Sequence, residues 1–327
     1  NKSTPTDGLS GTTSNYINVV QFNDVLYFVS FDFELRSWPG SGSSHAAVSG
    51  GFSAKGMDIV NNRIILAHII ANGVANPQTI KWTQNGTVSF TGTGSGTRDL
   101  AERSDIIQNI RKLGPYRGLV YKKESIVDMR ATGDASNPFD TTELVGGLGL
   151  LCPNSVAEWV GGHFFASSDE SIFGFDGSKF DDIGVDIRDE LFSNLNPNHY
   201  DIVVGFFNRP TSEYIIMIPT GSQLGMSPSL YYAYDVRKKR WRSGVYTGVT
   251  SFAPYISSGG ISWDEDIGTW DAATDNWNDP VGTATQQKTM VGTSSKKVFI
   301  LDETTPYLFD GAALQFSYQT GDIIGEN

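Results

Sequence analysis

The sequence predicts an all-β fold, a six-bladed β-propeller with four antiparallel strands in each blade. Three observations lead to this prediction. Short alternating or continuous apolar runs recur, and Gly, Asn and Asp residues typical of turns separate them. The runs repeat as units of roughly 40 to 55 residues, a length typical of propeller blades. The chain has 327 residues, 36 of them glycine and 12% aromatic, which favours one large β domain.

Each repeat consists of a first strand, a tight turn, an apolar second strand and a third strand that ends in a polar turn. The first three repeats begin at "NVVQFNDVLYFVSF", "KGMDIVNNRIILAHI" and "IQNIRKLGPYRGLVYKK". The last three begin at "NSVAEWVGGHFFASS", "DIVVGFFNRPTSEYIIMIP" and "KTMVGTSSKKVFILDE". Space remains in each repeat for a fourth strand. Phe175 and Phe309 each precede Asp-Gly, and we interpret these two turns as the third-strand ends of the fourth and sixth blades.

Two segments interrupt the repeats. In "GVDIRDELFSNLNP", the spacing of Ile187, Leu191 and Leu195 predicts one short helix between blades that ends before Pro197. The segment at about 257–287 contains three tryptophans, six acidic residues and no basic residue. We interpret it as an insertion outside the propeller core. The alternative is that it is the remnant of a seventh blade, which would make the propeller seven-bladed. Residues 1–327 are thus predicted to form a single propeller domain.

Composition excludes several classes of protein. The net charge of −12 disfavours tight binding to a phosphate backbone, which requires clustered Lys and Arg. Cys152 is the single cysteine, so no intramolecular disulfide can form, and we expect it to be a small buried apolar residue rather than a nucleophile. No apolar run is long enough to span a bilayer. Because the sequence lacks an initiator Met and ends without a closing element, we expect flanking domains to be missing from it.

No catalytic constellation is recognisable, so we predict that the protein is not an enzyme and has no cofactor. A glycosidase would need two positioned carboxylates, and a sialidase would also need several clustered arginines. The four histidines lie far apart in the sequence, which argues against a metal site. Calcium binding at Asp264, Asp266 and Asp271 is an alternative, but the order of ligands found in an EF-hand is absent.

Charge is segregated along the chain. Ser168–Glu190 carries eight acidic residues against two basic ones, whereas Arg103–Arg130 and Asp235–Arg242 are net basic. Adjacent subunits could therefore pair through surfaces of opposite charge, although solvated loops of mixed sign would give the same pattern. We predict a protein interface that includes Arg237, Lys238, Lys239, Arg240, Trp263, Trp270 and Trp277.

Several of these motifs together resemble one protein family. They are the strand start Glu124–Ile126, the Gly-x-Gly-x-x-x-Pro-Asn-Ser sequence at Gly147–Ser155, the Phe-Asp-Gly blade end, and "WDEDIGTWDAATDNWND". From about Gly51 onward, the chain is similar to the propeller region of tail-nozzle (tail tubular protein B type) proteins of short-tailed bacteriophages.

The resemblance implies a noncatalytic virion protein of the tail, assembled in the cytoplasm of the bacterial host. It implies a ring of subunits, a hexamer, that contacts neighbouring tail and adaptor proteins and encloses the channel through which DNA leaves. We expect DNA to pass without tight binding. The main alternative is a glycan-binding or glycan-cleaving propeller that uses the three tryptophans of the insertion as a sugar platform. An intracellular scaffold propeller is a weaker alternative, because Trp-Asp and Gly-His signals are not periodic here.

Overall fold

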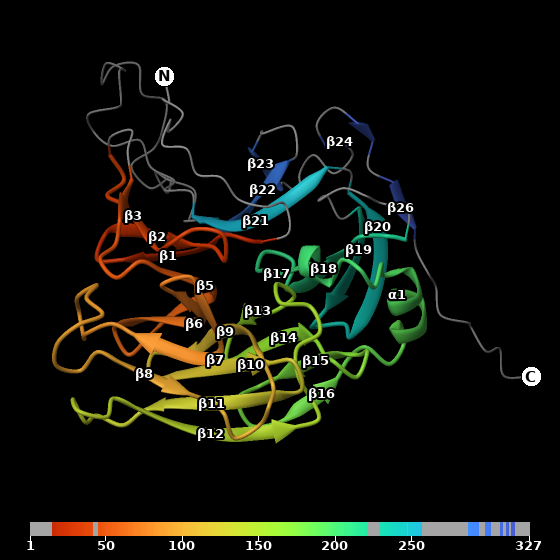
Figure 1. The fold of residues 1–327 in the computed structure, drawn as a ribbon. Helices are drawn as coiled ribbons and strands as arrows, with labels where there is room; N and C mark the ends of the chain where they lie inside the picture. Colours follow the sequence, from red (N-terminus) through yellow and green to blue (C-terminus); the bar gives the residue numbers. More distant parts are fainter. Residues whose placement is uncertain are drawn as a thin grey trace, which may run out of the picture.

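The computed structural model describes residues 15–41, 45–221, 229–246, 248–256, 287–293, 298–301, 308–309, 312–313 and 315–317. Within these ranges the chain is almost entirely β (Figure 1). The strands form four sheets of four strands, one of five, one of three and one of two, and all pairs are antiparallel. None of the helices in the described ranges is long and apolar enough to cross a bilayer.

The first three sheets each contain four strands that are consecutive in the sequence. Sheet 1 consists of β1 (Asn18–Phe22), β2 (Val25–Val29), β3 (Arg36–Trp38) and β4 (Ala46–Ala47). Sheet 2 consists of β5 (Phe52–Val60), β6 (Arg63–Ala71), β7 (Val74–Trp82) and β8 (Gly96–Asp99). Sheet 3 consists of β9 (Ile107–Gly114), β10 (Arg117–Lys122), β11 (Ser125–Ala131) and β12 (Phe139–Gly146).

The remaining sheets follow the same order until the last part of the chain. Sheet 4 consists of β13 (Ala157–Trp159), β14 (Gly162–Ala166), β15 (Ile172–Phe175) and β16 (Phe180–Asp182). After α1 (Arg188–Asn194) and the 3-10 helix η1 (Tyr200–Ile202), sheet 5 consists of β17 (Val204–Asn208), β18 (Glu213–Ile218), β19 (Leu230–Asp235), β20 (Arg240–Val245) and β26 (Gln315–Ser317). Sheet 6 consists of β21 (Val249–Ile256), β22 (Gln287–Thr293) and β23 (Val298–Leu301), and β24 (Leu308–Phe309) pairs with β25 (Ala312–Ala313).

The first five predicted repeats are confirmed as sheets 1 to 5, and Phe175 ends the third strand of sheet 4 as expected. The prediction for the sixth repeat is wrong by one strand. The sequence predicts the run at Lys288, which is β22, as the first strand of this sheet. In the structure β21 comes first, and it pairs with β22 from Val249↔Thr293 to Ile256↔Gln287. The Trp-rich segment therefore separates two paired strands of one sheet. The segment around Phe309 pairs with β25 rather than serving as the third strand of sheet 6.

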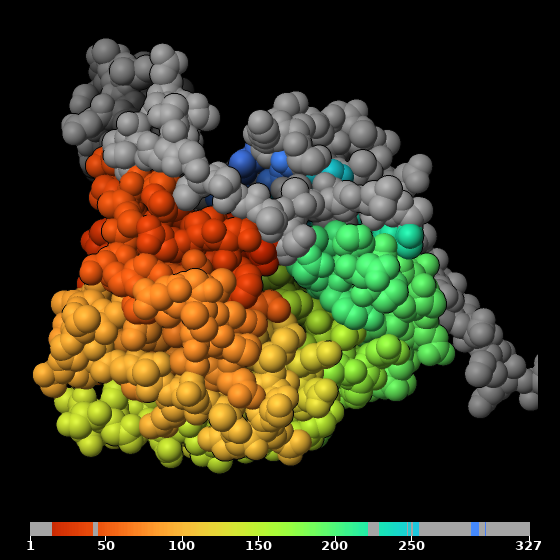
Figure 2. All heavy atoms as spheres, viewed as in Figure 1, coloured from red at the N-terminus to blue at the C-terminus, as the bar shows by residue number. Residues whose placement is uncertain are grey.

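Consecutive sheets pack face to face, and each interface between neighbours contains its own apolar cluster. The first strands lie beside one another, as seen where β1 contacts β5, β5 contacts β9, and β17 contacts β21. Between sheets 2 and 3, for example, Ile65 and Trp82 meet Ile110 and Phe139. Burying one such side chain contributes roughly 1.5 to 3 kcal/mol. In Figure 2 the atoms of sheets 1 to 3 form one continuous body, as this packing requires.

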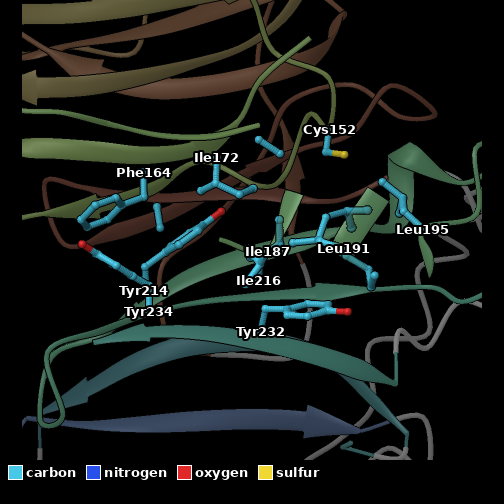
Figure 3. Close-up of a cluster of buried hydrophobic side chains, with 14 residues drawn as sticks. Cys152, Phe164, Ile172, Ile187, Leu191, Leu195, Tyr214, Ile216, Tyr232 and Tyr234 are labelled. Carbon is cyan, nitrogen blue, oxygen red and sulfur yellow. The ribbon is translucent and has the colours of Figure 1, made fainter. Parts of the chain in front are cut away.

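The predicted helix is confirmed as α1, which begins after Ile187 and ends before Leu195. Ile187, Leu191 and Leu195 point into the cluster between sheets 4 and 5, together with Tyr214 and other side chains (Figure 3). Cys152 belongs to the same cluster and is fully buried, and this burial raises the pKa of its thiol. The prediction that Cys152 is a small buried apolar residue is confirmed.

The segment Gly147–Ser155 joins sheet 3 to sheets 4 and 5. A Cβ at Gly149 would collide with the backbone of Lys123, so only glycine allows this close approach. Ser155 Oγ accepts from the Ala166 N–H of sheet 4 at 3.0 Å, and the Ser155 carbonyl accepts from the Tyr214 hydroxyl of sheet 5 at 2.9 Å. The segment acts as a structural joint between sheets.

Candidate functional site

In sheets 2 to 5, the connections between first and second strands, and between third and fourth strands, lie at the same end of each sheet, because successive strands are antiparallel. We call this the turn-lined end. Hydrogen bonds join its turns from sheet to sheet. The Asn61 N–H donates to the Pro115 carbonyl at 2.7 Å, and Arg117 Nη1 donates to the Gly177 carbonyl at 2.8 Å. The turns of sheets 2, 3 and 4 therefore form one connected surface.

A cavity of about 480 Å³ lies among these turns, where the first strands of sheets 2, 3 and 4 end. We call it the inner cavity. It is an open hollow whose wall mixes apolar and polar side chains and includes one large aromatic residue, Trp159. Its walls are Ile59, Asn61, Asn62, Lys112, Leu113, Gly114, Pro115, Glu158, Trp159, Gly162 and His163.

Trp159 is the aromatic wall of the inner cavity. It ends β13 and stacks on Phe164, with ring centroids 5.3 Å apart and an interplanar angle of 27°. Its Nε1 atom is buried and has no hydrogen-bond partner in the structure. Buried indole N–H groups are normally paired, so this unpaired donor of a cavity-wall residue is an exception.

Glu158 supplies a half-buried carboxyl beside Trp159. Burial raises its pKa, and the nearby Asp58 carboxylate raises it further, while Lys112, Arg111 and Arg209 act in the opposite direction. Asp58 is on β5, Arg111 on β9 and Glu158 on β13, and Arg209 follows β17. Charges of alternating sign thus follow one another from sheet 2 to sheet 5.

His163 forms the floor of the inner cavity and is 1% exposed. Its Nε2 lies 2.8 Å from the Lys112 carbonyl, which can only accept, so Nε2 carries the proton. Its Nδ1 therefore accepts from the Tyr121 hydroxyl at 2.9 Å. Burial lowers the pKa of His163 to about 4, so the imidazole is neutral at physiological pH.

A second cavity, of about 460 Å³, lies farther from the first strands, between the β7–β8 and β11–β12 loops. We call it the outer cavity. Asn61 lines both cavities. The walls of the outer cavity are mostly neutral and polar, but Arg63 adds a buried guanidinium. The complete wall consists of Asn61, Arg63, Gln84, Asn85, Thr87, Thr93, Gly94, Gly133, Asp134, Ala135 and Pro138.

The predicted basic interface is an exposed turn at the turn-lined end. Arg237, Lys238, Lys239 and Arg240 connect β19 to β20, and all four are exposed. Asp235 Oδ1 accepts from the N–H groups of Arg237 and Lys238 at 2.9 and 3.0 Å, which fixes the turn. Trp263, Trp270 and Trp277, and the calcium alternative at Asp264, Asp266 and Asp271, lie outside the described residues.

The part of the chain that the structure describes contains no group of three His, Cys, Asp or Glu side chains arranged to hold a metal ion. The turn-lined end carries aromatic and charged groups beside its two cavities. It offers a stacking face at Trp159, a carboxyl at Glu158 and a cation at Arg63, each at the edge of a cavity.

Comparison with known proteins supports the fold. No family model matches the sequence, and no curated protein does. Among solved structures, the chain is similar to "YCF48 bound to D1 peptide", with 9% identity and a TM-score of 0.50 over 96% of this chain and 86% of that one. It is also similar to "Dihydro-heme d1 dehydrogenase NirN in complex with DHE", with 8% identity and a TM-score of 0.49 over 94% of this chain. The match covers 57% of the NirN chain.

At such low identity the likeness concerns the fold alone. It confirms an all-β, propeller-like arrangement of antiparallel four-stranded sheets.

Sequence reasoning missed the residues that form the two cavities. A signal for Arg63 was present, because "NNRIILAHI" places one charged residue at the start of a run that is otherwise continuously apolar. A charged residue at the start of a strand that is buried on both faces is expected to be buried as well. The signal for Trp159 was weaker, since "EWVGG" indicates only a strand that ends in a turn.

Proposed function

We propose that this protein is a noncatalytic structural component of the tail of a short-tailed bacteriophage, of the tail-nozzle type. In this proposal the sheets form a six-bladed propeller, with sheet 6 closing on sheet 1. Copies of the propeller form a ring, a hexamer, around the channel through which DNA leaves the virion.

The structural role of Gly147–Ser155 supports this proposal. This segment carries part of the resemblance to nozzle proteins, and it joins three sheets through the close approach at Gly149 and the hydrogen bonds that Ser155 accepts from Ala166 and Tyr214. The packing of the three sheets restricts which residues fit in this joint. A motif shared at this place is therefore stronger evidence of a common fold than a motif shared in a surface turn. The resemblance therefore concerns how the sheets are assembled.

The exposed basic turn is the observation that carries the assembly part of the proposal. Arg237–Arg240 presents four cations on a backbone fixed by Asp235. The Trp-rich segment of the same chain has six acidic residues and no basic one. A head-to-tail contact between the basic turn of one subunit and the acidic segment of the next would repeat around a ring and close it.

Native mass spectrometry with electron micrographs tests this contact. We expect the unmodified chain to form rings, and a variant with Arg237, Lys238, Lys239 and Arg240 all changed to Ser to remain monomeric. Lys179→Ser is the matched control, because Lys179 lies in the corresponding third-to-fourth-strand turn of sheet 4 and is 71% exposed. Rings formed by the quadruple variant would contradict the proposed contact.

Deletion of residues 262–279 should give the same loss of assembly while the propeller remains folded. Circular dichroism and thermal unfolding of the deletion variant would show whether it does. Global unfolding would instead place these tryptophans in the propeller core.

The proposal also predicts the behaviour of the protein toward DNA. A channel wall that gripped phosphates would slow the passage of DNA, and the net charge of −12 is compatible with weak contact. We expect no measurable binding of duplex DNA by the isolated protein near physiological salt. Micromolar affinity that falls steeply with salt and is lost in the quadruple variant would make the basic turn a nucleic-acid site.

A second candidate function is glycan binding, and Trp159 favours it. A stacked indole with an unused N–H, beside the Glu158 carboxyl in an open cavity, has the elements of a sugar subsite. Titration with neutral and acidic oligosaccharides, followed by tryptophan fluorescence, separates the two functions. Saturable quenching that is lost in Trp159→Ala would favour glycan binding. Neither function requires turnover, and we expect no hydrolysis of glycans or esters.

A further inference from the structure

Arg63 is a buried cation that has no counterion among the described residues. It is the first residue of β6 and is 4% exposed. Because side chains alternate along a strand, it lies on the same face as Ile65 and Ala67, which pack between sheets 2 and 3. Its Nε and Nη1 atoms are buried and have no hydrogen-bond partner. Within the described ranges of the chain, no carboxylate forms an ion pair with it.

Leaving a guanidinium in this state is unfavourable. Buried charges are normally paired, and buried N–H donors are normally hydrogen-bonded. Burial lowers the pKa of Arg63, but arginine remains protonated at neutral pH. Its positive charge therefore persists at the wall of the outer cavity.

The outer cavity surrounds this charge with neutral hydrogen-bonding groups. Gln84 and Asn85 offer amides, and Thr93 offers a hydroxyl. The guanidinium reaches the loop that carries Thr93, since a Cβ placed on Gly94 would lie 3.3 Å from Arg63 Nη2. Gly94 has φ +83°, so glycine is favoured there both by the backbone and by the space.

Asp134 is the acidic residue in the wall of this cavity. Its Oδ1 accepts from the Ser136 N–H at 2.7 Å, within its own loop. It therefore stabilises the β11–β12 loop, and its negative charge opposes an anion in the cavity.

We propose that the outer cavity binds a small oxyanion, a phosphate or carboxylate group, on the guanidinium of Arg63. Amide and hydroxyl groups of Gln84, Asn85 and Thr93 complete the site. Guanidinium groups pair well with both anions, because their N–H groups match the spacing of two oxygen atoms. This inference does not depend on the proposed role in a tail.

Thermal unfolding tests the proposal with inorganic phosphate and with acetate as probes, each compared with sodium chloride at equal ionic strength. We expect the unfolding temperature of the unmodified protein to rise saturably with either probe. Arg63→Met should unfold at a higher temperature than the unmodified protein in chloride, since it removes an unpaired buried charge. The same variant should show no response to the probes. Arg103→Met is the matched control, as it removes an exposed guanidinium at the opposite end of the sheets, and it should keep the full response.

Asp134→Asn should change the affinity for phosphate in the opposite direction to Arg63→Met. Removal of the opposing charge should tighten the apparent affinity for phosphate by about threefold to tenfold. The proposal is overturned if the unmodified protein responds to phosphate and acetate no more than to chloride, or if Arg63→Met responds equally. A response to an acidic peptide alone would also overturn it, because the anion would then come from a protein partner.

Discussion

The interface between sheets 2 and 3 contains a buried basic residue at each end, and the two are treated differently. Lys122, 1% exposed, ends β10, and its Nζ donates to the carbonyls of Leu100 and Arg103 at 2.9 and 3.2 Å. Arg63, 4% exposed, begins β6 at the turn-lined end and leaves Nε and Nη1 unpaired. The two residues are similar in charge and burial. They differ in hydrogen bonding because the fold places carbonyl groups around Lys122 but not around Nε and Nη1 of Arg63.

We call the end of the sheets at Lys122 the structural end, and the turn-lined end at Arg63 and Trp159 the binding end. Around Lys122, Asp105 accepts from the Glu124 N–H and from Ser125 Oγ at 3.0 and 2.9 Å, so polar groups are used within the protein. Around Arg63 and Trp159, polar groups are unused and cavities are open. Buried polar groups are costly when unpaired, so Arg63 and Trp159, each in a cavity wall, mark candidate places for a ligand, whereas other unpaired atoms such as Ser167 Oγ lie away from these cavities.

The largest expected effect is at the structural end. Asp105→Ala should lower the free energy of unfolding by about 3 kcal/mol, because it leaves the Glu124 N–H and the buried Ser125 hydroxyl unpaired and removes a negative charge that interacts with Lys122. Urea unfolding measures the change. The matched control is Asp134→Ala at the turn-lined end, where the exposed carboxylate should matter far less. A cost for Asp105→Ala below about 1 kcal/mol would remove the distinction between the two ends.

Acid should lower the free energy of unfolding by protonating His163, the buried histidine in the wall of the inner cavity. The pKa of His163 is lowered from 6.5 to about 4, so the stability it contributes is present above pH 6.5 and is lost as the pH falls through 4. The full loss is on the order of 3 kcal/mol for this shift. Urea unfolding across this pH range, with NMR titration of the His163 ring, measures both quantities. Titration of the ring near 6.5 would show that the imidazole is accessible to water.

The contribution of Glu158 to the free energy of unfolding should be smaller than that of His163 and should depend on pH in the opposite direction. Its pKa is raised above 4.5 by burial and by Asp58, so its contribution to stability is present below pH 4.5 and is lost as the pH rises through the pKa in the folded protein. At pH 7, Glu158→Gln should therefore raise the free energy of unfolding, by less than about 1 kcal/mol because the group is half-exposed to solvent. Asp169→Asn, on an exposed loop at the opposite end, is the control. A loss of stability in Glu158→Gln would mean that the carboxylate is well paired.

The smallest effect is expected for Trp159→Phe. This change keeps an aromatic ring on Phe164 and removes the unpaired N–H, so stability should change by no more than about 0.5 kcal/mol. Thermal unfolding of the variant without ligand is the measurement. A loss above about 1.5 kcal/mol would show that Nε1 has a structural partner, and the binding end would then resemble the structural end.

Much of the fold followed from the sequence because its signals are local. Hairpins at Asn23-Asp24 and Asn61-Asn62 place residues with positive φ between apolar runs, and both turns are where the repeats predict them. The helix was visible from the spacing of Ile187, Leu191 and Leu195 alone. Each of these features depends on neighbours within one turn or one hairpin.

The first strand of sheet 6 could not be assigned in this way. Ile256 pairs with Gln287, and the long segment between them separates the two halves of the hairpin. Without a tight turn, no local signal connects the strands, so β22 was mistaken for the first strand. The binding end was missed for a related reason. Trp159 and Arg63 belong to different sheets, and only tertiary packing shows that Asn61 lies in the walls of both their cavities.

The added strand of sheet 5 has a consequence for how the chain is made. Sheets 1 to 4 consist of consecutive strands, so each can be completed as soon as its own residues leave the ribosome. Sheet 5 cannot, because β26 pairs with β20 through Ser243↔Ser317 and Val245↔Gln315, after all three strands of sheet 6 have been synthesised. The outer edge of β20 is therefore unpaired throughout the translation of sheet 6. During that interval the nascent chain presents an open strand edge, to which a neighbouring chain could add a strand in place of β26.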